Sequence, residues 1–139
     1  MARRRARGDV NPAALVAHLQ DVMTEKVGPF RTGDKLDAAL AEIERLAAAI
    51  GDDPLAAGTP FDSVLIDWLD LRNMLPVARS VVLGARARTE SRGAHQREDF
   101  PGLDERWLCN QVATLGSGGL ALETVPVARR VETGVGVPA

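Results

Sequence analysis

"FDSVLIDWLDLRNMLPVARSVVLGARAR", residues 61–88, is the stretch that decides the fold of this 139-residue chain. Its apolar residues recur at intervals of three, four or seven from Leu65 to Ala85, which places them on one face of an α-helix. Pro76 cannot donate a hydrogen bond to the carbonyl of Arg72, so a kink is expected there. The stretch therefore predicts one long helix that bends at Pro76 and buries one face.

Two shorter helices are expected before it. The first begins at Asn11, whose side chain can cap the free N–H groups ahead of a proline at the first helical position, and ends at Gly28. The second begins at Asp34, where a carboxylate can cap the first turn and oppose the positive end of the helix dipole, and ends at Gly51. This pattern predicts an all-α fold, a three-helix antiparallel bundle with a long third helix and an irregular C-terminal tail.

The rest of the chain divides around this bundle. Four of the first seven residues are arginines, and residues 1–10 are expected to form a basic flexible arm ahead of a helical domain at residues 11–112. A short helix is expected from Leu103 or Asp104, and residues 113–139 are expected to form an extended or flexible tail. The glycine run at 116–119 favours a flexible turn in that tail.

Composition narrows the classes of function. The chain has 17 basic and 19 acidic residues and a net charge of −2, so it lacks the overall field that draws a protein onto nucleic acid. No apolar run approaches the roughly 18 residues that span a bilayer, which favours a cytoplasmic protein with no direct membrane span. The single Cys109 cannot form an internal disulfide, and with His18 and His95 it makes a poor metal site.

Familiar cofactor motifs are missing as well. The sequence contains neither of the glycine patterns that cradle the phosphates of dinucleotides and nucleoside triphosphates. It also lacks the HExxH, CxxC and GxSxG patterns of zinc, redox and hydrolase sites. We therefore expect no familiar cofactor site in this chain.

The stretch "TESRGAHQREDFPGLDERWLCN", residues 89–110, is the only one that resembles an active site. Arginine side chains offer planar forks of donors that suit a carboxylate or a phosphate, and a histidine can move a proton near neutral pH. One interpretation is a dicarboxylate site built from Arg92, His95 and Arg97. The other is a charged loop in which nearby acids occupy those donors, namely Glu90, Glu98 and Asp99. The residues alone leave both open.

Several motifs in the chain resemble one protein family. Leu69 to Leu75 reads "LDLRNML", and residues 88–101 read "RTESRGAHQREDFP", with Trp107-Leu108 following. Upstream, residues 15–46 read "LVAHLQDVMTEKVGPFRTGDKLDAALAEIERL". Together these resemble the C-terminal helical domain of the flavoprotein subunit of succinate dehydrogenases and fumarate reductases, which L-aspartate oxidases share. The resemblance covers roughly residues 12–112.

The resemblance implies a role without catalysis. In that family, FAD binding, the flavin-linking histidine and the dicarboxylate-reducing residues belong to flavin and capping domains, outside the stretch of resemblance. The C-terminal domain is a spectrin-repeat-like three-helix bundle that packs on the flavin domain. The chain would thus be an accessory domain that binds no cofactor alone, and FAD would belong to its partner. The residues expected at the interface with the flavin domain are Asn73, Glu90, Ser91, Arg92, His95, Arg97 and Asp99.

The same resemblance implies one further partner, and two alternatives compete with the docking role. An iron–sulfur subunit is a further expected partner, and a partner complex would bring any membrane association. One alternative is a stand-alone module in which Arg92, His95 and Arg97 bind a small dicarboxylate. The other is a homo-oligomer that buries, against its own copies, the surface a flavin domain would cover.

Overall fold

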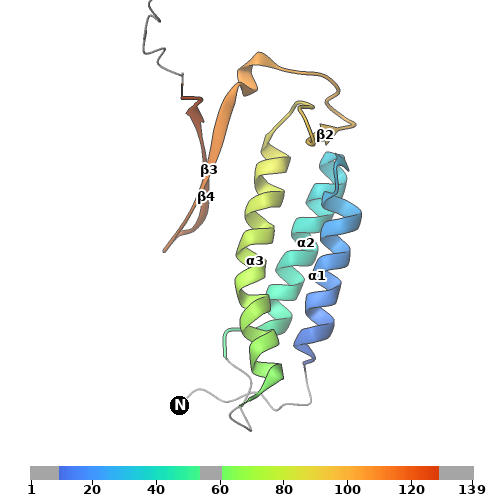
Figure 1. Ribbon diagram of the computed structural model, residues 1–139, viewed down its shortest axis with the longest axis vertical. Helices are drawn as coiled ribbons and strands as arrows, with labels where there is room; N and C mark the ends of the chain where they lie inside the picture. The colour runs from blue at the N-terminus through green and yellow to red at the C-terminus, as the bar shows by residue number, and fades with distance from the viewer. Residues whose placement is uncertain (1–9, 54–60, 129–139) are drawn as a thin grey trace, which may run out of the picture.

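The computed structural model describes residues 10–53 and 61–128 of the chain. Three α-helices lie side by side, the second antiparallel to the first and the third, and the chain after the third helix folds over one end of this bundle (Figure 1). The elements in order are α1 (Pro12–Val27), β1 (Phe30–Arg31), α2 (Gly33–Ile50), α3 (Ser63–Ala87), β2 (Gln96–Arg97), a 3₁₀ helix (Glu105–Trp107), β3 (Cys109–Gly116) and β4 (Gly119–Pro126).

The helix ends follow local capping chemistry. The Asn11 side chain accepts a hydrogen bond from the Ala14 backbone N–H, which confirms the predicted start of α1. The predicted start of α2 at Asp34 is wrong, because the Thr32 side chain is the N-cap and Asp34 lies within the first helical turn. Gly51, with φ of 69°, ends α2 as predicted, since a positive φ favours glycine.

One apolar core joins the three helices. The helix α3 continues through Pro76, as predicted, and the kink at this proline stays a prediction. Trp68 on α3 is buried, and its indole N–H donates to the Ile50 carbonyl at 3.3 Å, which satisfies the last turn of α2. The buried apolar residues are Leu19, Val22, Val27, Leu36, Ala39, Ile43, Leu46, Ile50, Trp68, Leu71, Leu75, Ala78, Val82 and Ala85.

The prediction of an all-α fold with an irregular tail is wrong. Strands β3 and β4 form an antiparallel hairpin, so the fold combines α-helices with β-strands. Helix was expected from Leu103 or Asp104 onward, yet within that stretch only Glu105–Trp107 forms a turn of 3₁₀ helix. The physical reason is that the chain from Cys109 finds a pairing partner in the tail, and strand pairing satisfies the backbone of both segments together.

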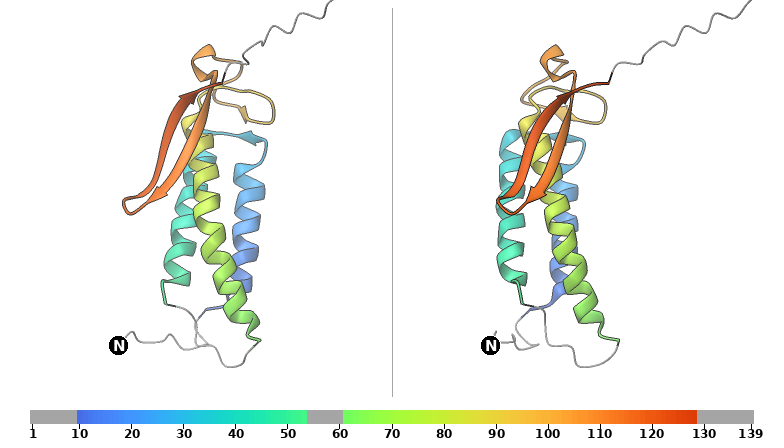
Figure 2. Two further views of the ribbon diagram at one scale, coloured as in Figure 1. Left: turned by 60° about the vertical axis from the view of Figure 1, so that its left-hand side comes forward. Right: turned by 90° about the vertical axis from the view of Figure 1, so that its left-hand side faces the viewer.

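The hairpin depends on its turn and on its contact with α3. Gly116 pairs with Gly119, so the predicted turn at 116–119 is confirmed, and Gly119 has φ of 98°, which an L side chain rarely adopts. Figure 2 shows the hairpin lying along α3 outside the bundle. Inner residues Ala113 and Leu122 line one hollow against α3, and Leu115 lines another.

Some predictions lie outside the described residues. These are residues 1–9 of the expected basic arm and residues 129–139 of the expected tail. The domain limits at 11–112 therefore stay a prediction. Within residues 10–53 and 61–128, no helix combines the length and the apolar character that crossing a membrane requires.

Candidate functional site

Residues 88–108, called the charged loop below, cover the end of the bundle where α1 connects to α2. The parallel pairing of β1 with β2 attaches the loop to this connection. The Gln96 backbone N–H donates to the Pro29 carbonyl, and the Glu98 backbone N–H donates to the Arg31 carbonyl, both at 3.0 Å. Segments more than sixty residues apart in the sequence are thus held together at one end, called the loop end below.

Arg97 anchors the charged loop to the bundle. Its side chain is fully buried, and its Nη1 lies 3.1 Å from each of three backbone carbonyls at the end of α3. Its Nε and Nη2 donate to the two carboxylate oxygens of Asp99, each at 2.8 Å. A cation is favoured at this position because the C-terminus of a helix carries a partial negative charge. The three carbonyls belong to Ala85, Arg86 and Arg88.

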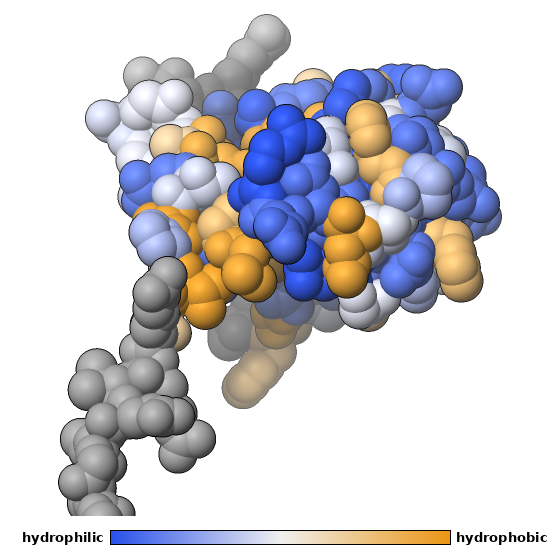
Figure 3. Space-filling model, turned by 90° about the horizontal axis from the view of Figure 1, so that it is seen from above, coloured by the Kyte–Doolittle hydropathy of each residue, from blue (hydrophilic) through white to orange (hydrophobic). Residues whose placement is uncertain are grey.

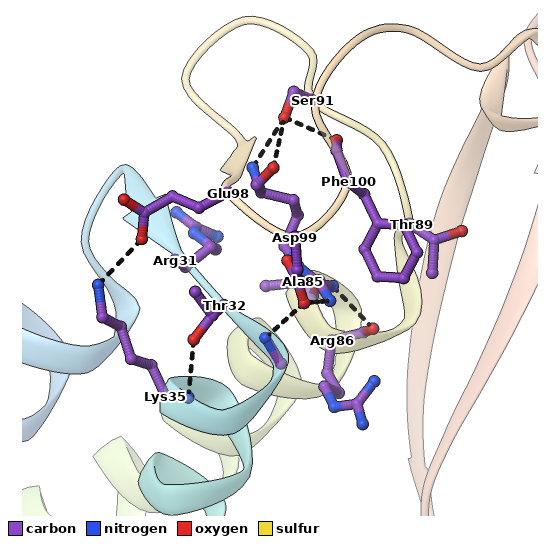
Figure 4. A network of polar contacts seen from close by, with 12 residues as sticks. Arg31, Thr32, Lys35, Ala85, Arg86, Thr89, Ser91, Glu98, Asp99 and Phe100 are labelled. Atoms are coloured by element: carbon purple, nitrogen blue, oxygen red, sulfur yellow. Dashed lines mark hydrogen bonds and ion pairs between the residues drawn. The ribbon is translucent and has the colours of Figure 1, made fainter.

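Asp99 extends this anchor to α2. Its Oδ2 accepts a hydrogen bond of 2.8 Å from the backbone N–H of Gly33, the first residue of α2. The guanidinium of Arg97 and the Gly33 N–H hold the pKa of Asp99 well below its ordinary value. The Arg97–Asp99 pair therefore joins the C-terminus of α3 to the N-terminus of α2, with each charge at the helix end that favours it (Figure 4).

Glu90 organises the other half of the charged loop. Its side chain is fully buried, and its carboxylate accepts hydrogen bonds from Arg88, from Arg92 and from the Asp104 backbone N–H. The bonds from Arg92, Asp104 and Arg88 lower the pKa of Glu90 to about 2. Arg88 also donates to the carbonyls of Trp107 and Cys109 at 2.9 Å. This half of the loop is thereby tied to the start of β3.

Ser91 and His95 complete the loop with bonds to the backbone. The Ser91 hydroxyl accepts a hydrogen bond from the Arg97 backbone N–H at 2.9 Å and donates one to the Phe100 carbonyl at 3.0 Å. His95 Nε2 lies 3.2 Å from the Arg88 carbonyl, and its Nδ1 lies 3.4 Å from Arg31 Nη1. Burial lowers the pKa of His95, and nearby arginines lower it further. The partners on both nitrogens fit a neutral ring with its proton on Nε2.

The structure brings together all but one of the residues expected at the interface. Glu90, Ser91, Arg92, His95, Arg97 and Asp99 all lie in the charged loop. Asn73 does not, because it is exposed near the middle of α3. Ala87, the last residue of α3, follows Asn73 by 14 positions, which correspond to about 21 Å of helix.

The geometry distinguishes the two interpretations of this stretch, a dicarboxylate site or a loop whose own acids occupy the arginine donors. Arg92 is paired with Glu90 and Arg97 with Asp99, so nearby acids do occupy these donors. Glu98 instead reaches Lys35 on α2, at 3.1 Å. Because Glu90 and Asp99 already accept from the Nε and Nη2 groups of Arg92 and Arg97, the geometry fits a charged loop better than a dicarboxylate site.

Sequence reasoning missed two members of this cluster. Arg88 was part of the quoted motif, and its position two residues before Glu90 could have signalled the pair. Arg31 carried no local signal, since only the pairing of β1 with β2 places it beside His95. Both residues are partly buried at the loop end.

The arrangement suits a fixed structure better than a reaction centre. Most charges are paired and hydrogen-bonded to the backbone, which fixes their positions. Across residues 10–53 and 61–128, no group of His, Cys, Asp and Glu residues is placed to hold a metal ion.

The surface around the charged loop mixes charged and apolar residues. Viewed from the loop end, hydrophilic residues lie among separate apolar ones (Figure 3). Four large apolar side chains on segments at this end are exposed. They are Phe30 (69%), Phe100 (40%), Leu103 (70%) and Leu108 (66%). Such a mixture is found at protein–protein interfaces, where apolar anchors sit within a polar rim.

Known proteins resemble this chain in sequence and in fold. At the level of sequence, the chain is 38% identical over 121 residues to the fumarate reductase flavoprotein subunit of Mycobacterium tuberculosis, covering 84% of this chain and 20% of that protein. It is 33% identical over 127 residues to the succinate dehydrogenase flavoprotein subunit of Rickettsia conorii, covering 89% of this chain and 21% of that protein. The chain thus spans about a fifth of the length of these curated relatives.

The structural comparison agrees with the sequence. The fold matches a chain of the Mycobacterium smegmatis Sdh1 complex in the apo form with a TM-score of 0.74 and 31% identity, covering 90% of this chain and 22% of that chain. The family model described as fumarate reductase flavoprotein C-term matches residues 16–133, which is most of the chain. The chain therefore belongs to the family of fumarate reductase and succinate dehydrogenase flavoprotein C-terminal domains.

Proposed function

We propose that this chain is an accessory domain that docks onto an FAD-bearing flavoprotein domain and does not catalyse alone. Its relatives are flavoprotein chains about four times as long, and the chain matches their C-terminal domain. The FAD would be held by the partner, whose reaction would be of the succinate-oxidising or fumarate-reducing class. An iron–sulfur subunit would join through that partner.

The observation that carries this proposal is the construction of the loop end. The two fully buried charges of the charged loop, Glu90 and Arg97, are paired within the chain, so the loop holds its shape before any partner binds. Its exposed apolar side chains have no covering element among the described residues. A surface with fixed geometry and exposed apolar anchors loses little conformational entropy on binding, which favours docking.

The interface residues divide into two roles under this proposal. Glu90 and Arg97 are buried, so they shape the loop without touching the partner. Arg92 has 37% and Asp99 has 34% of its side chain exposed, and these two would face the partner across the boundary. Asn73 would contact the partner only if the covered surface extends along α3.

The first experiment is to capture partners from native lysate with the tagged chain and record the flavin absorbance of the eluate. We expect a yellow eluate from the wild type and a colourless one from Leu103→Asp, which places a charge among the apolar residues of the loop end. Phe61→Asp is the matched control, because Phe61 is 94% exposed just before α3, at the other end of the bundle. A colourless wild-type eluate, or equal flavin from both variants, would contradict the proposal.

The same exposed residues favour one second candidate, a homo-oligomer formed through the loop end. Exposed apolar surface can be buried against a second copy when no flavin domain is present. Sedimentation of the purified chain distinguishes the two. Self-association that Leu103→Asp abolishes would support it, whereas a monomer at high concentration would exclude it.

A further inference from the structure

A polar cavity lies beside the charged loop, where the hairpin meets α3 and β1. Its volume is about 380 Å³, which is ample for a small organic anion or for one side chain of another protein. The residues that give it a polar lining are Arg31, Ser80, Arg88, His95 and Gln111. No acidic side chain of the described residues lines it, so the cavity is cationic.

Arg31 supplies the unbalanced charge. Its Nε donates to the Gly28 carbonyl at 2.8 Å, and its Nη1 faces His95 Nδ1 at 3.4 Å. Among residues 10–53 and 61–128 it forms no ion pair with a carboxylate, and in Figure 4 no dashed line joins it to Glu98 or Asp99. Burial, and then repulsion by Arg97, lower the pKa of Arg31. A counter-ion would therefore stabilise this group.

The Glu90 and Asp99 carboxylates of the charged loop do not neutralise Arg31, because they already pair with other arginines. Glu90 accepts from both Arg88 and Arg92, and Asp99 pairs with Arg97. Among Arg31, Arg88, Arg92 and Arg97, Arg31 is thus the one that forms no ion pair with an acid of the described part of the chain.

Gln111 provides an independent observation at the same cavity. It lies on β3, and its side-chain Nε2 is buried without a hydrogen-bond partner among the described residues. Unsatisfied buried donors are rare in folded proteins and costly in free energy, so each calls for an explanation. An acceptor group in the cavity, reached by rotation of the amide, would satisfy it.

We propose that this cavity binds a carboxylate group, with Arg31 as the counter-ion and the Gln111 amide as a second donor. One cation and one neutral donor match the single charge and two oxygens of a carboxylate. A phosphate dianion would need further donors and charge, and Arg88 is already engaged with the Glu90 carboxylate and two backbone carbonyls. His95 adds no charge, because its lowered pKa keeps the ring neutral near neutral pH.

The carboxylate has two possible sources. It can be a free small carboxylate, or it can be an Asp or Glu side chain of the docked flavoprotein. The second source rests on the proposed function and the first does not. The experiment therefore has one arm for each.

The first arm uses NMR titration of the isolated chain with acetate and with succinate, against chloride at equal ionic strength. We expect saturable shifts of the Gln111 side-chain amide and of the Arg31 Nε–H resonance. The Gln96 amide, which donates to the Gly93 carbonyl, should stay still. Arg31→Gln should weaken binding at least about tenfold, because a charge-assisted bond is lost. Arg45→Gln, which removes an exposed arginine elsewhere, should leave it unchanged.

A second variant guards against misfolding, because Arg31 also holds the Gly28 carbonyl. Gln111→Leu keeps that bond and the charge but removes the amide, so it should weaken carboxylate binding by a smaller factor than Arg31→Gln. Shifts that never saturate, or that survive in both variants, would show that no free carboxylate binds in the cavity.

The second arm measures the affinity of the captured flavoprotein for the chain. If free carboxylates do not bind but Arg31→Gln weakens this complex at least about tenfold, with the effect lost at high salt, the source is an acidic side chain of the partner. If neither arm responds, the inference is overturned. If no flavoprotein is captured at all, the proposed function fails, and the titration alone decides the cavity.

Discussion

At the scale of single residues, the loop end is held by charges that pair within the chain. Arg97 alone joins three backbone carbonyls at the end of α3 to Asp99, and through Asp99 to α2. The sequence shows that acids and arginines alternate in this stretch, but it does not show which pairs form. That choice depends on which side chains the fold buries, and Glu90 and Arg97 are the two buried ones.

Arg97→Met should lower the free energy of unfolding by about 3 kcal/mol, because it leaves three carbonyls and a carboxylate without their donor. Arg79→Met is the control, since Arg79 forms an exposed pair with Glu44, and it should cost about 1 kcal/mol or less. Urea unfolding followed by circular dichroism measures both. Equal losses in the two variants would refute the role given to Arg97.

Glu90 should make stability depend on acid pH. Its pKa is about 2 in the folded chain against 4.5 for an ordinary glutamate, so the unfolded chain binds more protons between these values. The contribution of Glu90 is thus complete above pH 4.5 and is lost as pH falls toward 2. Glu90→Gln should flatten the fall of the urea midpoint over this range. A ¹³C titration of the wild-type carboxyl gives a second readout, and an ordinary pKa there would contradict the network.

At the scale of elements, the three helices could be predicted from apolar spacing and caps, because both signals are local. The Thr32 cap was missed by two residues, since Thr32 and Asp34 are both good N-cap residues and only the fold chooses between them. The hairpin could not be predicted from the same signals. A strand exists only with its partner, and β3 has a short apolar pattern that fits helix or strand.

Gly119 should control the stability of the hairpin. Gly119→Ala forces a side chain into φ of 98° and should destabilise the turn by about 1 kcal/mol. Gly118→Ala is the matched control. An added Cβ there meets nothing within 4 Å, and the φ of Gly118 lies outside the positive range that disfavours an L side chain. Amide exchange of residues 109–126 reports the change. Similar exchange in the two variants would show that the turn does not depend on Gly119.

At the scale of the whole molecule, the two ends of the bundle differ in kind. The loop end gathers segments from three parts of the chain and fixes them with buried charges, whereas Phe61 near the other end is exposed beside a connection. Local sequence could not show that Arg31 and Gln111 meet at one cavity, because 80 residues separate them and two separate strand pairings place them. The family motif could still be seen, because its residues are contiguous.

The central claim is that the loop end is the docking face, and amide hydrogen exchange of the chain with and without the captured flavoprotein tests it most directly. We expect protection on binding at residues 28–32 and 88–108, with exchange at residues 61–70 unchanged. Protection at residues 61–70, with none at the charged loop, would contradict the account.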